Sequence, residues 1–445
     1  MSFHATLDQL ITILGASAQN LPNTTITGIT TDSRSIQSGE IFLALRGEKF
    51  DGHDFVRSAI EQGAIAAIVD TQFESDDLPV LIVSDTLQAY QAIAHWWRKQ
   101  FNIPIIAITG SVGKTTTKEL IAAALSKYGK VHKTQANYNN EIGVPKTLLE
   151  LNSDYDFAVI EMGMRALGEI ALLSQIANPD ISVITNVGTA HIGRLGSREA
   201  IAQAKCELLA EMPKEAIAIL NHDNPLLLET AKTVWQGKST TYGLQGGDLQ
   251  GQLIDAETIK VGELQFPLPL PGEHNALNFL AALAVIQALN LDAAKLTTGI
   301  TVELPSGRSR RYELSNDVVI LDESYNAGLE SMLASLKLLA QTEGDRKIAV
   351  LGTMKELGDW SVQYHQQVGE QVRALQLDRL LILADPDEAQ AMAIAAAPVP
   401  AETFTSHTAV VSRLNELIRS GDRILFKASR AVGLDLVVAA LIPSK

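Results

Sequence analysis

The stretch "IIAITGSVGKTTTKELI", residues 105–121, decides the fold. A β-rich apolar run ends at Thr109, a loop with two glycines follows, and a helical pattern begins near Lys114. This order of strand, tight loop and helix is typical of a phosphate cradle, because glycines let successive N–H groups turn toward an anion. The N-terminus of the helix adds the positive end of its dipole. The segment therefore predicts a nucleotide-binding loop in an α/β protein.

Individual residues of this loop have expected roles. Lys114 can reach the β- and γ-phosphates of a nucleotide, and the Thr115 hydroxyl can ligate Mg²⁺. The standard pattern places a glycine five residues before Gly113, whereas this chain has Ile108 there, so the loop is a variant. An ordinary glycine-rich turn, a phosphotransferase loop and a nucleotide-driven switch are alternatives at this point. The expected nucleotide contacts are Thr109, Gly110, Ser111, Val112, Gly113, Lys114, Thr115 and Thr116.

Length and charge narrow the class of protein. The 445 residues exceed what one core holds, so two or three domains are expected. Acidic residues number 51 against 36 basic ones, giving a formal charge of -15. Such a surface repels phosphate backbones, so we expect no nucleic-acid partner. An anionic substrate would instead need a local cluster of cations.

The remaining bulk features favour a cytoplasmic enzyme. The single cysteine, Cys206, allows no internal disulfide, and we expect it to be half-buried and not a nucleophile. Residues 1–15 have no basic region followed by an apolar core, so we expect no signal peptide. No apolar run approaches the roughly 20 residues of a membrane span.

The order of patterns along the chain predicts three α/β domains, at 1–100, 101–305 and 306–445. Short β-rich runs occupy 25–83 and a helical segment 86–100. A β-rich patch (240–268), a helix (274–289) and a Gly/Ser/Arg-rich break (305–311) separate two alternating regions. Alternation of strands and helices argues for parallel βαβ units. The expected strands are 105–109, 157–161, 181–185 and 216–220, then 318–321, 347–351, 379–383 and 423–426.

Several polar side chains follow expected strands, where open parallel sheets bind ligands. Glu161 ends "DFAVIE", and His191 lies in "NVGTAHIGRLGS"; both can converge with Thr115 around a triphosphate. A helix-capping carboxylate and an ordinary loop histidine are the alternatives. Lys205, on a helix starting near Ser197, is taken from the pattern alone as a solvated surface lysine.

Other polar clusters could contact substrates. Amides crowd "TQANYNNEIGVPKTLLE", and "GRSRR" places three arginines within residues 307–311, where they could meet phosphates. Turn-rich loops, helix caps and an exposed basic linker are the alternatives. The residues concerned are Asn137, Asn139, Asn140, His274, Asn275, Arg308, Arg310, Arg311, Asp322, Ser324, Tyr325, Asn326, Lys427, Ser429 and Arg430.

Taken together, the motifs resemble the Mur ligase family over nearly the whole chain. The loop is similar to the family form T-G-x-x-G-K-T-[ST], which accounts for the missing early glycine. "DSRSIQSGEIFLALRGEKFDGHDF" (32–55) looks like the family's uridine-nucleotide-binding domain, and "IEMGM", "PGEHNALN", "LDESYNAG", "LGTMKELG" and "FKASR" follow in the family's order. The resemblance implies a small α/β uridine-nucleotide domain, a central P-loop domain with a parallel sheet and a Rossmann-like C-terminal domain.

The resemblance implies an ATP-dependent amide ligase of cytoplasmic peptidoglycan precursor synthesis. "SYNA" and "LGxMxELG" are of the type that joins D-alanyl-D-alanine to UDP-N-acetylmuramoyl-tripeptide through an acyl phosphate. A related ligase with another acceptor, including a folylpolyglutamate-type ligase, is the alternative. We expect a monomer. Two departures from the family pattern are Thr353, where an acidic residue is common, and Ala428, where glycine is usual.

The resemblance also implies a site. Thr115 and Glu161 would hold one Mg²⁺, and His191 and Lys205 would serve a second, with Lys114 in the catalytic set. Lys205 occupies the position that carries an N-carbamate in several members, which replaces the surface reading. Domain closure about a hinge near Gly307 would assemble the nucleotide contacts His274, Asn275, Arg308 and Asp322. The expected substrate-binding residues are Thr31, Asp32, Ser33, Arg34, Asn137, Asn139, Asn140, Tyr325, Asn326, Lys427 and Ser429.

Overall fold

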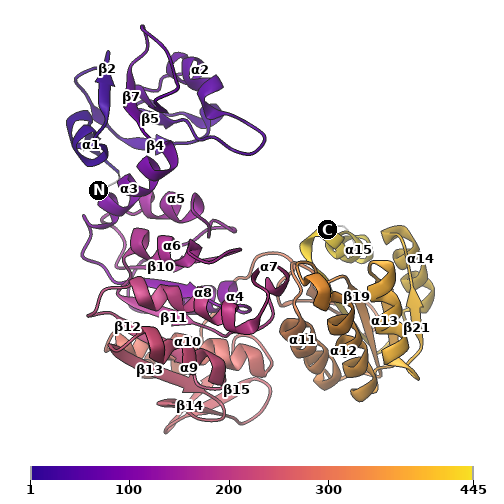
Figure 1. Ribbon diagram of the computed structural model, residues 1–445. Helices are drawn as coiled ribbons and strands as arrows, with labels where there is room; N and C mark the ends of the chain where they lie inside the picture. Colours follow the sequence, from indigo (N-terminus) through magenta and orange to yellow (C-terminus); the bar gives the residue numbers. More distant parts are fainter. Residues whose placement is uncertain (1–2, 443–445) are drawn as a thin grey trace.

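The computed structural model describes residues 3–442, which form three lobes in chain order (Figure 1). The N-terminal lobe holds a five-stranded sheet in the order β2-β7-β6-β5-β4, in which only the β2–β7 pair is antiparallel. A separate short ribbon pairs β1 with β3. The elements are β1 (Ala5–Thr6), α1 (Leu7–Leu14), β2 (Ser17–Gln19), β3 (Thr25–Ile26), β4 (Gly28–Thr30), η1 (Ser33–Ser35), β5 (Glu40–Leu43), η2 (Gly52–Phe55), α2 (Val56–Glu61), β6 (Ala66–Asp70), β7 (Val80–Val83) and α3 (Thr86–Arg98).

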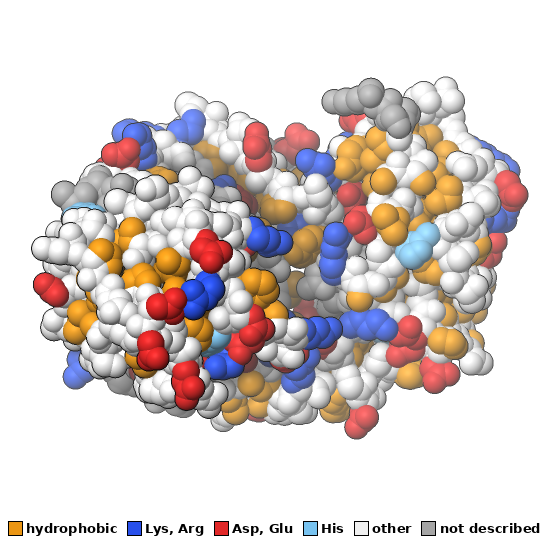
Figure 2. Space-filling view, turned by 90° about the horizontal axis from the view of Figure 1, so that it is seen from above, with side chains coloured by type: hydrophobic (Ala, Val, Ile, Leu, Met, Phe, Trp, Pro, Cys, Tyr) orange, Lys and Arg blue, Asp and Glu red, His pale blue; other side chains and the backbone are white. Residues whose placement is uncertain are grey.

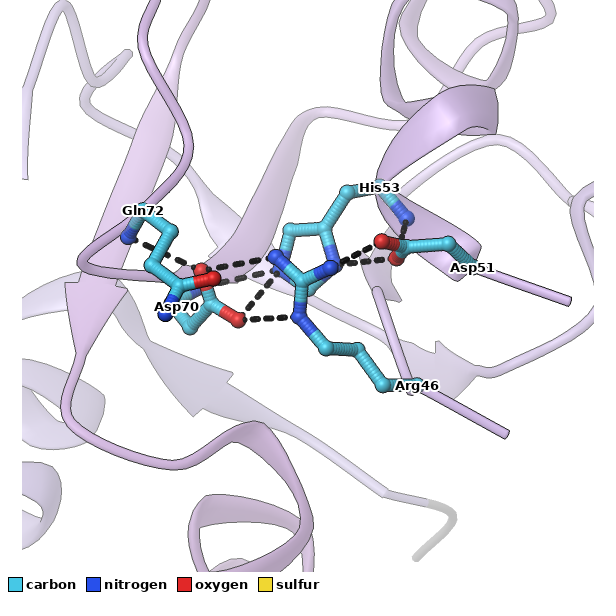
Figure 3. A network of polar contacts seen from close by, with 5 residues as sticks. All are labelled: Arg46, Asp51, His53, Asp70 and Gln72. Carbon is cyan, nitrogen blue, oxygen red and sulfur yellow. Dashed lines mark hydrogen bonds and ion pairs between the residues drawn. The ribbon is translucent and has the colours of Figure 1, made fainter. Parts of the chain in front are cut away.

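A network of charged side chains ties the segment after β5 to the end of β6 (Figure 3). Arg46 forms ion pairs with both Asp51 and Asp70. His53 is buried between the same two acids: its Nδ1 lies 2.7 Å from Asp51, and its Nε2 accepts the Asp70 N–H at 3.0 Å. The hydrogen bond from Arg46 lowers the pKa of Asp70. The network therefore fixes the loop between residues 46 and 53 on the sheet.

The central lobe is built on a nine-stranded sheet in the order β16-β15-β14-β13-β12-β11-β8-β10-β9. Its strands are parallel from β9 to β14, and the predicted β-rich patch adds β15 and β16 as an antiparallel extension. The elements are β8 (Ile105–Thr109), α4 (Lys114–Leu125), β9 (Val131–Lys133), α5 (Gly143–Leu149), β10 (Phe157–Glu161), α6 (Glu169–Ala177), β11 (Ile181–Ile184), α7 (Ile192–Leu195), α8 (Arg198–Glu211), β12 (Ile217–Asn221), α9 (Pro225–Val234), β13 (Lys238–Gly243), β14 (Leu249–Leu253), β15 (Thr258–Val261), β16 (Leu264–Pro267), α10 (Glu273–Ala288) and η3 (Ala293–Thr298).

Strand β8 shows why this sheet lies inside the lobe. Ile105 and Ala107 belong to the apolar cluster that includes α5, α6 and α8, whereas Ile106 and Ile108 belong to the cluster that includes α4 and α10. A parallel strand that is covered on both faces needs a continuous apolar run, which "IIAI" supplies. Strands β8, β10, β11 and β12 are parallel neighbours, so their carboxyl ends meet at one edge of the sheet, as expected from the sequence.

The C-terminal lobe contains a six-stranded sheet in the order β17-β18-β22-β19-β20-β21, with only the β17–β18 pair antiparallel. All eight strands expected in the two alternating regions are present, with ends shifted by at most two residues. The elements are β17 (Arg310–Leu314), β18 (Val318–Glu323), α11 (Leu329–Gln341), β19 (Arg346–Gly352), η4 (Gly358–Trp360), α12 (Ser361–Ala374), β20 (Arg379–Leu383), α13 (Pro386–Ala396), β21 (Ala401–Thr403), α14 (His407–Leu417), β22 (Asp422–Lys427), η5 (Arg430–Val432) and α15 (Leu434–Leu441).

One sequence interpretation of α8 is wrong: Cys206 is completely buried, where half-burial was expected. Lys205 is 1% exposed, so the pattern alone, which suggested a surface lysine before the family resemblance replaced that interpretation, did not indicate its burial. Burial raises the pKa of the Cys206 thiol to about 12, which agrees with the expectation that it is not a nucleophile. Within residues 3–442, every helix is too short or too polar to cross a membrane.

Helix α3 attaches the N-terminal lobe firmly to the central lobe. Its side chains donate to main-chain carbonyls of the central lobe: Trp97 Nε1 to Leu151 at 3.0 Å and Gln91 Nε2 to Glu141 at 3.1 Å. The buried Arg98 donates to the carbonyls of Ala177 and Asn178 and pairs with Asp180 at 2.9 Å. These bonds join segments about 50 to 80 residues apart.

We predict that Arg98→Ala destabilises this joint by about 2–3 kcal/mol, because it leaves buried carbonyls without donors. Calorimetry should show that the N-terminal and central lobes of this variant unfold at a lower temperature than those of the wild type. The matched control is Arg57→Ala, whose ion pair with Asp77 is exposed and contributes little. Equal effects of the two substitutions would contradict a role for Arg98 in the joint.

Candidate active site

A cavity of about 720 Å³ lies between the carboxyl edge of the central sheet and the C-terminal lobe. An adjoining cavity of about 610 Å³ shares Thr115, Asn137, Arg308 and Tyr325 with it. Seen from above, the molecule is hollowed between its lobes, and Lys and Arg side chains surround the hollow (Figure 2). Six Glu side chains and six Lys or Arg side chains line the larger cavity; the cations are Lys114, Arg165, Lys205, Arg308, Lys355 and Lys427. These cations can meet an anion locally although the chain as a whole is acidic.

The phosphate loop has the predicted backbone. Gly113 has a φ of +84°, and a Cβ there would lie 2.7 Å from Asn278 Oδ1 of α10, so a larger residue would be strained. A Cβ on Gly110 would collide with Thr185 Oγ1. Asn186 Oδ1 accepts the Val112 N–H at 3.0 Å and so holds the loop in place. Gly113, Lys114, Thr115 and Thr116 line the cavity at the N-terminus of α4.

Lys114 lies folded over the loop. Its Nζ donates to the carbonyl of Gly110 at 2.7 Å. Burial lowers the pKa of Lys114, while Glu161 opposes this effect and Arg308 adds to it. A bound anion would favour the charged form of the amine, which is what a phosphate-contacting lysine requires.

Glu161 at the end of β10 is suited to hold a cation. The residue is 2% exposed. Its Oε1 accepts from Asn139 Nδ2 at 2.8 Å, whereas its Oε2 is buried without a hydrogen-bond donor and lies 3.8 Å from Lys118 Nζ. A buried carboxylate oxygen that lacks a donor is costly unless a ligand satisfies it. Glu161 and the buried Thr115 both line the cavity, so the structure brings this predicted pair together.

His191 and Lys205 line the same cavity from other elements. His191 precedes α7 with a left-handed φ of +67°, and burial lowers its pKa against the opposing charge of Glu356. Burial, followed by repulsion from Lys114, holds the pKa of Lys205 well below its usual range. A buried amine of this kind is neutral for part of the time, and a neutral amine can react with CO₂.

The start of α10 and the segment before β17 also line the larger cavity. Asn275 donates to the Pro271 carbonyl at 2.8 Å, and Asn278 links it to Thr117 of α4. Burial lowers the pKa of His274. Arg308 lies 4.0 Å above the Tyr325 ring, and its Nε is buried without an acceptor.

Residues at the ends of β18 and β22 form the wall that belongs to the C-terminal lobe. Asp322 lines the smaller cavity and accepts from Ser324 Oγ at 2.5 Å. Lys427 is buried, donates to the Asn326 carbonyl at 3.1 Å and lies 3.8 Å from Glu323. Burial lowers the pKa of Lys427, and Glu323 opposes this shift. Asn326 and Lys427 line the larger cavity, as do Asn137, Asn139, Asn140 and Tyr325.

Some predicted residues lie elsewhere. Arg310 and Arg311 are exposed on β17 and line neither cavity, so only Arg308 of the three arginines faces the site. Ser429 accepts the Lys355 N–H at 2.9 Å behind the cavity wall. Asp32 pairs with Arg34 at 2.7 Å, and its pKa is lowered to about 2 by that hydrogen bond. The residues Thr31, Asp32, Ser33 and Arg34 line neither cavity, so their substrate contacts stay predictions.

The two family departures have local structural roles. Thr353 is buried and its Oγ1 accepts the Asp385 N–H at 2.8 Å, next to the start of α13, so it does not face the cavity. Ala428 is buried against Gly352. Sequence reasoning missed Glu330 and Glu356, which reach the central lobe from the C-terminal lobe. Their motifs, "NAGLE" and "KELG", gave no sign of a partner far away in the chain.

Comparisons with known proteins agree with this architecture. Family models match residues 25–123 (Mur ligase family, catalytic domain), 108–286 (Mur ligase middle domain) and 307–430 (Mur ligase, glutamate ligase domain). The chain is 58% identical over 419 residues to the UDP-N-acetylmuramoyl-tripeptide–D-alanyl-D-alanine ligase of Synechocystis, covering 94% of this chain and 92% of that relative.

Solved structures give the same result. A MurF crystal structure from Acinetobacter baumannii superposes with a TM-score of 0.91 at 32% identity, covering 99% of each chain. MurF from Thermotoga maritima in complex with ADP gives a TM-score of 0.82 at 29% identity, covering 93% of this chain and 96% of that chain. On this evidence the chain belongs to the Mur ligase family.

Proposed function

We propose that this chain joins D-alanyl-D-alanine to UDP-N-acetylmuramoyl-tripeptide, with conversion of ATP to ADP and phosphate, in the cytoplasmic synthesis of peptidoglycan precursors. The observation that carries the proposal is the 58% identity, over 419 residues, to a ligase named for this reaction. The cavity supports it, because the phosphate loop, Glu161 and the wall formed by the C-terminal lobe all border one space. We further propose that the chain acts as a monomer.

The donors in the cavity fit ATP and Mg²⁺. The first turn of α4 and Lys114 would hold phosphates, and Thr115 with the unsatisfied Oε2 of Glu161 would hold one Mg²⁺. His191 and an N-carbamate on Lys205 would hold a second ion. No group of three His, Cys, Asp or Glu side chains within residues 3–442 is placed to hold a metal. Phosphate oxygens of a bound nucleotide could supply further ligands. Bound Mg²⁺ would neutralise phosphate charge and polarise the γ-phosphoryl group.

The chemistry proceeds in two displacements. The terminal carboxylate of the tripeptide attacks the γ-phosphorus of ATP, and the bond to the bridging oxygen breaks to release ADP. The neutral amine of the dipeptide (–NH2) then attacks the carbonyl carbon of the acyl phosphate and forms a C–N bond. The tetrahedral intermediate loses one nitrogen proton, to the departing phosphate or to solvent, and collapses to an amide as the C–O bond breaks and phosphate leaves.

The residues of the cavity deal with two obstacles, charge repulsion and water. Lys114, Arg308 and Lys427 place cationic groups where a carboxylate must approach a triphosphate. Closure of the C-terminal lobe onto the central lobe would exclude water from the acyl phosphate, which would otherwise hydrolyse. His274 and Asn275 on one wall, and Asp322 on the other, would orient the nucleoside.

We predict that ADP release by the purified chain requires ATP, Mg²⁺, UDP-N-acetylmuramoyl-tripeptide and D-Ala-D-Ala together. The product should gain the mass of one dipeptide less one water. Substrates with diaminopimelate or lysine as the third residue, and a depsipeptide acceptor, would define specificity. ADP formed without an acceptor, or formed only with a single amino acid, would favour a switch or a related ligase instead.

We predict that Glu161→Gln lowers kcat by about 100-fold or more, because an amide is a poor ligand for Mg²⁺. The Mg²⁺ concentration for half-maximal activity should rise as well. Glu211→Gln is the control, since Glu211 only accepts from Gln175 on an exposed surface. Unchanged Mg²⁺ dependence in Glu161→Gln would remove Glu161 from the metal site.

We predict that Lys205→Ala loses activity and regains part of it with short carboxylic acids, which replace the oxygens of a carbamate. Depleting CO₂ should slow the wild-type chain. Lys114→Ala is the control, because Lys114 is another lysine that lines the cavity and should show no rescue. An alanine variant with full activity would rule out carbamation as a requirement.

A further inference from the structure

The segment 185–189, which follows β11, lies directly against the phosphate loop. The main-chain carbonyl of Asn186 accepts the Ser111 N–H at 3.1 Å. The side chain of Asn186 forms two bonds with one residue: its Oδ1 accepts the Val112 N–H, and its Nδ2 donates to the Val112 carbonyl, each at 3.0 Å. The Thr185 hydroxyl also donates to the Val112 carbonyl, at 2.6 Å. The middle of the loop is therefore held through its main chain.

The fit between the two segments is close. A side chain on Gly110 has no room, because its Cβ would collide with Thr185 Oγ1. Ser111 is buried, and its Oγ accepts the Gly188 N–H at 2.9 Å. The segment is supported in turn by Asn221 at the end of β12, which donates to the Thr185 carbonyl at 2.9 Å. A rigid strand end thus stands behind the bonds that reach the loop.

These bonds divide the main-chain donors of the loop into two groups. The N–H groups of Ser111 and Val112 are occupied by Asn186. Within residues 3–442, the N–H groups of residues 113–116 form no hydrogen bond, as expected for the first turn of a helix. Only the second group is free to bind phosphate oxygens. The residues that Asn186 holds come directly before this group and so set its position.

We propose that Asn186 is a positioning residue for nucleotide binding, which sets the phosphate loop in its binding form before a nucleotide arrives. The inference rests on the proposed function only in naming a nucleoside di- or triphosphate as the ligand. Asn186 also lines the cavity, so a direct contact with the nucleotide is the competing explanation that the tests must separate.

Preorganisation explains why one amide matters. Gly110 and Gly113 have a positive φ, and a loop with two such glycines can adopt several backbone conformations when nothing holds it. Ordering the loop before binding reduces the entropy that the nucleotide must overcome. A primary amide offers a donor and an acceptor side by side, which match the C=O and N–H of Val112. Aspartate at this position would supply acceptors alone, and alanine would supply neither.

The first test needs neither nucleotide nor metal ion. Hydrogen exchange of the full-length chain is measured by mass spectrometry on peptides that cover residues 108–116. We expect slow exchange of the Val112 N–H in the wild type and fast exchange in Asn186→Ala, which removes its acceptor. Asn186→Asp should retain the slow exchange, because its carboxylate can still accept from Val112. If Asn186→Ala does not fold, Asn186→Ser takes its place, since its side chain carries one polar atom where Asn186 has two.

The second test measures the Kd for ADP by titration calorimetry in the presence of Mg²⁺. In Asn186→Ala we expect the Kd to rise by about 10-fold, because two hydrogen bonds that hold the loop are lost. The KM for ATP should rise by a similar factor, and the KM for the UDP-sugar peptide should change little.

The matched control is Asn224→Ala. Asn224 also holds the segment 185–189, since it donates to the Val187 carbonyl at 3.0 Å, and it caps α9, but it forms no bond with the phosphate loop. We expect Asn224→Ala to lose thermal stability and to keep both the wild-type exchange at 108–116 and the wild-type Kd for ADP.

Faster exchange together with weaker ADP binding in Asn186→Ala alone would support the inference. Weaker binding with unchanged exchange would make Asn186 a direct nucleotide contact and would overturn it. Equal loss of ADP affinity in Asn224→Ala would point to general destabilisation and would overturn it as well. The expected exchange and ADP affinities in a chain that forms no amide would refute the proposed function and leave the positioning role of Asn186 intact.

Discussion

The burial of cationic side chains around an anion site is the constraint on which the rest of the structure depends. Lys114, Lys205 and Lys427 are held in the walls of one cavity, and burial lowers the pKa of each. Such groups are unfavourable without anions, so the fold must supply rigid supports that keep them in place. The sheet edge supplies them in the central lobe, and β22 supplies them in the C-terminal lobe. A triphosphate and a carboxylate can then share one space.

Much of this arrangement could be predicted because its causes are local. The phosphate loop needs a positive φ at Gly110 and Gly113, and parallel strands covered on both faces need apolar runs, so both features can be recognised in the sequence. Glu161 lies at the end of β10 and Asp322 near the end of β18, where parallel sheets bind ligands. The roles of Thr115, Glu161, His191 and Lys205 came from family resemblance, and the structure adds that all four line one cavity.

The rest depends on packing between segments far apart in the chain. The side chain of Lys205 is polar, yet it is buried on the same face of α8 as Ile201 and Leu208, and only the packing of the surrounding elements determines which face is covered. Arg310 and Arg311 looked like phosphate ligands, but strand pairing with β18 places them on an exposed surface. The contacts of Glu330 and Glu356 with the loop at 187–196 span more than 100 residues and require the docked C-terminal lobe. No periodicity or motif encodes such a contact.

The two joints between lobes differ in a way that suits the proposed reaction. Helix α3 is bound to the central lobe by buried side chains that donate to main-chain carbonyls, and such bonds cannot be exchanged for water without exposing the joint. The C-terminal lobe contacts the loop at 187–196 through Glu330, through Glu356 and through the main chain at Gly193, and the segment 299–309 before β17 has neither helix nor strand. A segment without helix or strand bends more easily than a helix whose side chains are buried in the joint. Movement should therefore concentrate at this second joint, and the joint that moves is the one that reaches His191.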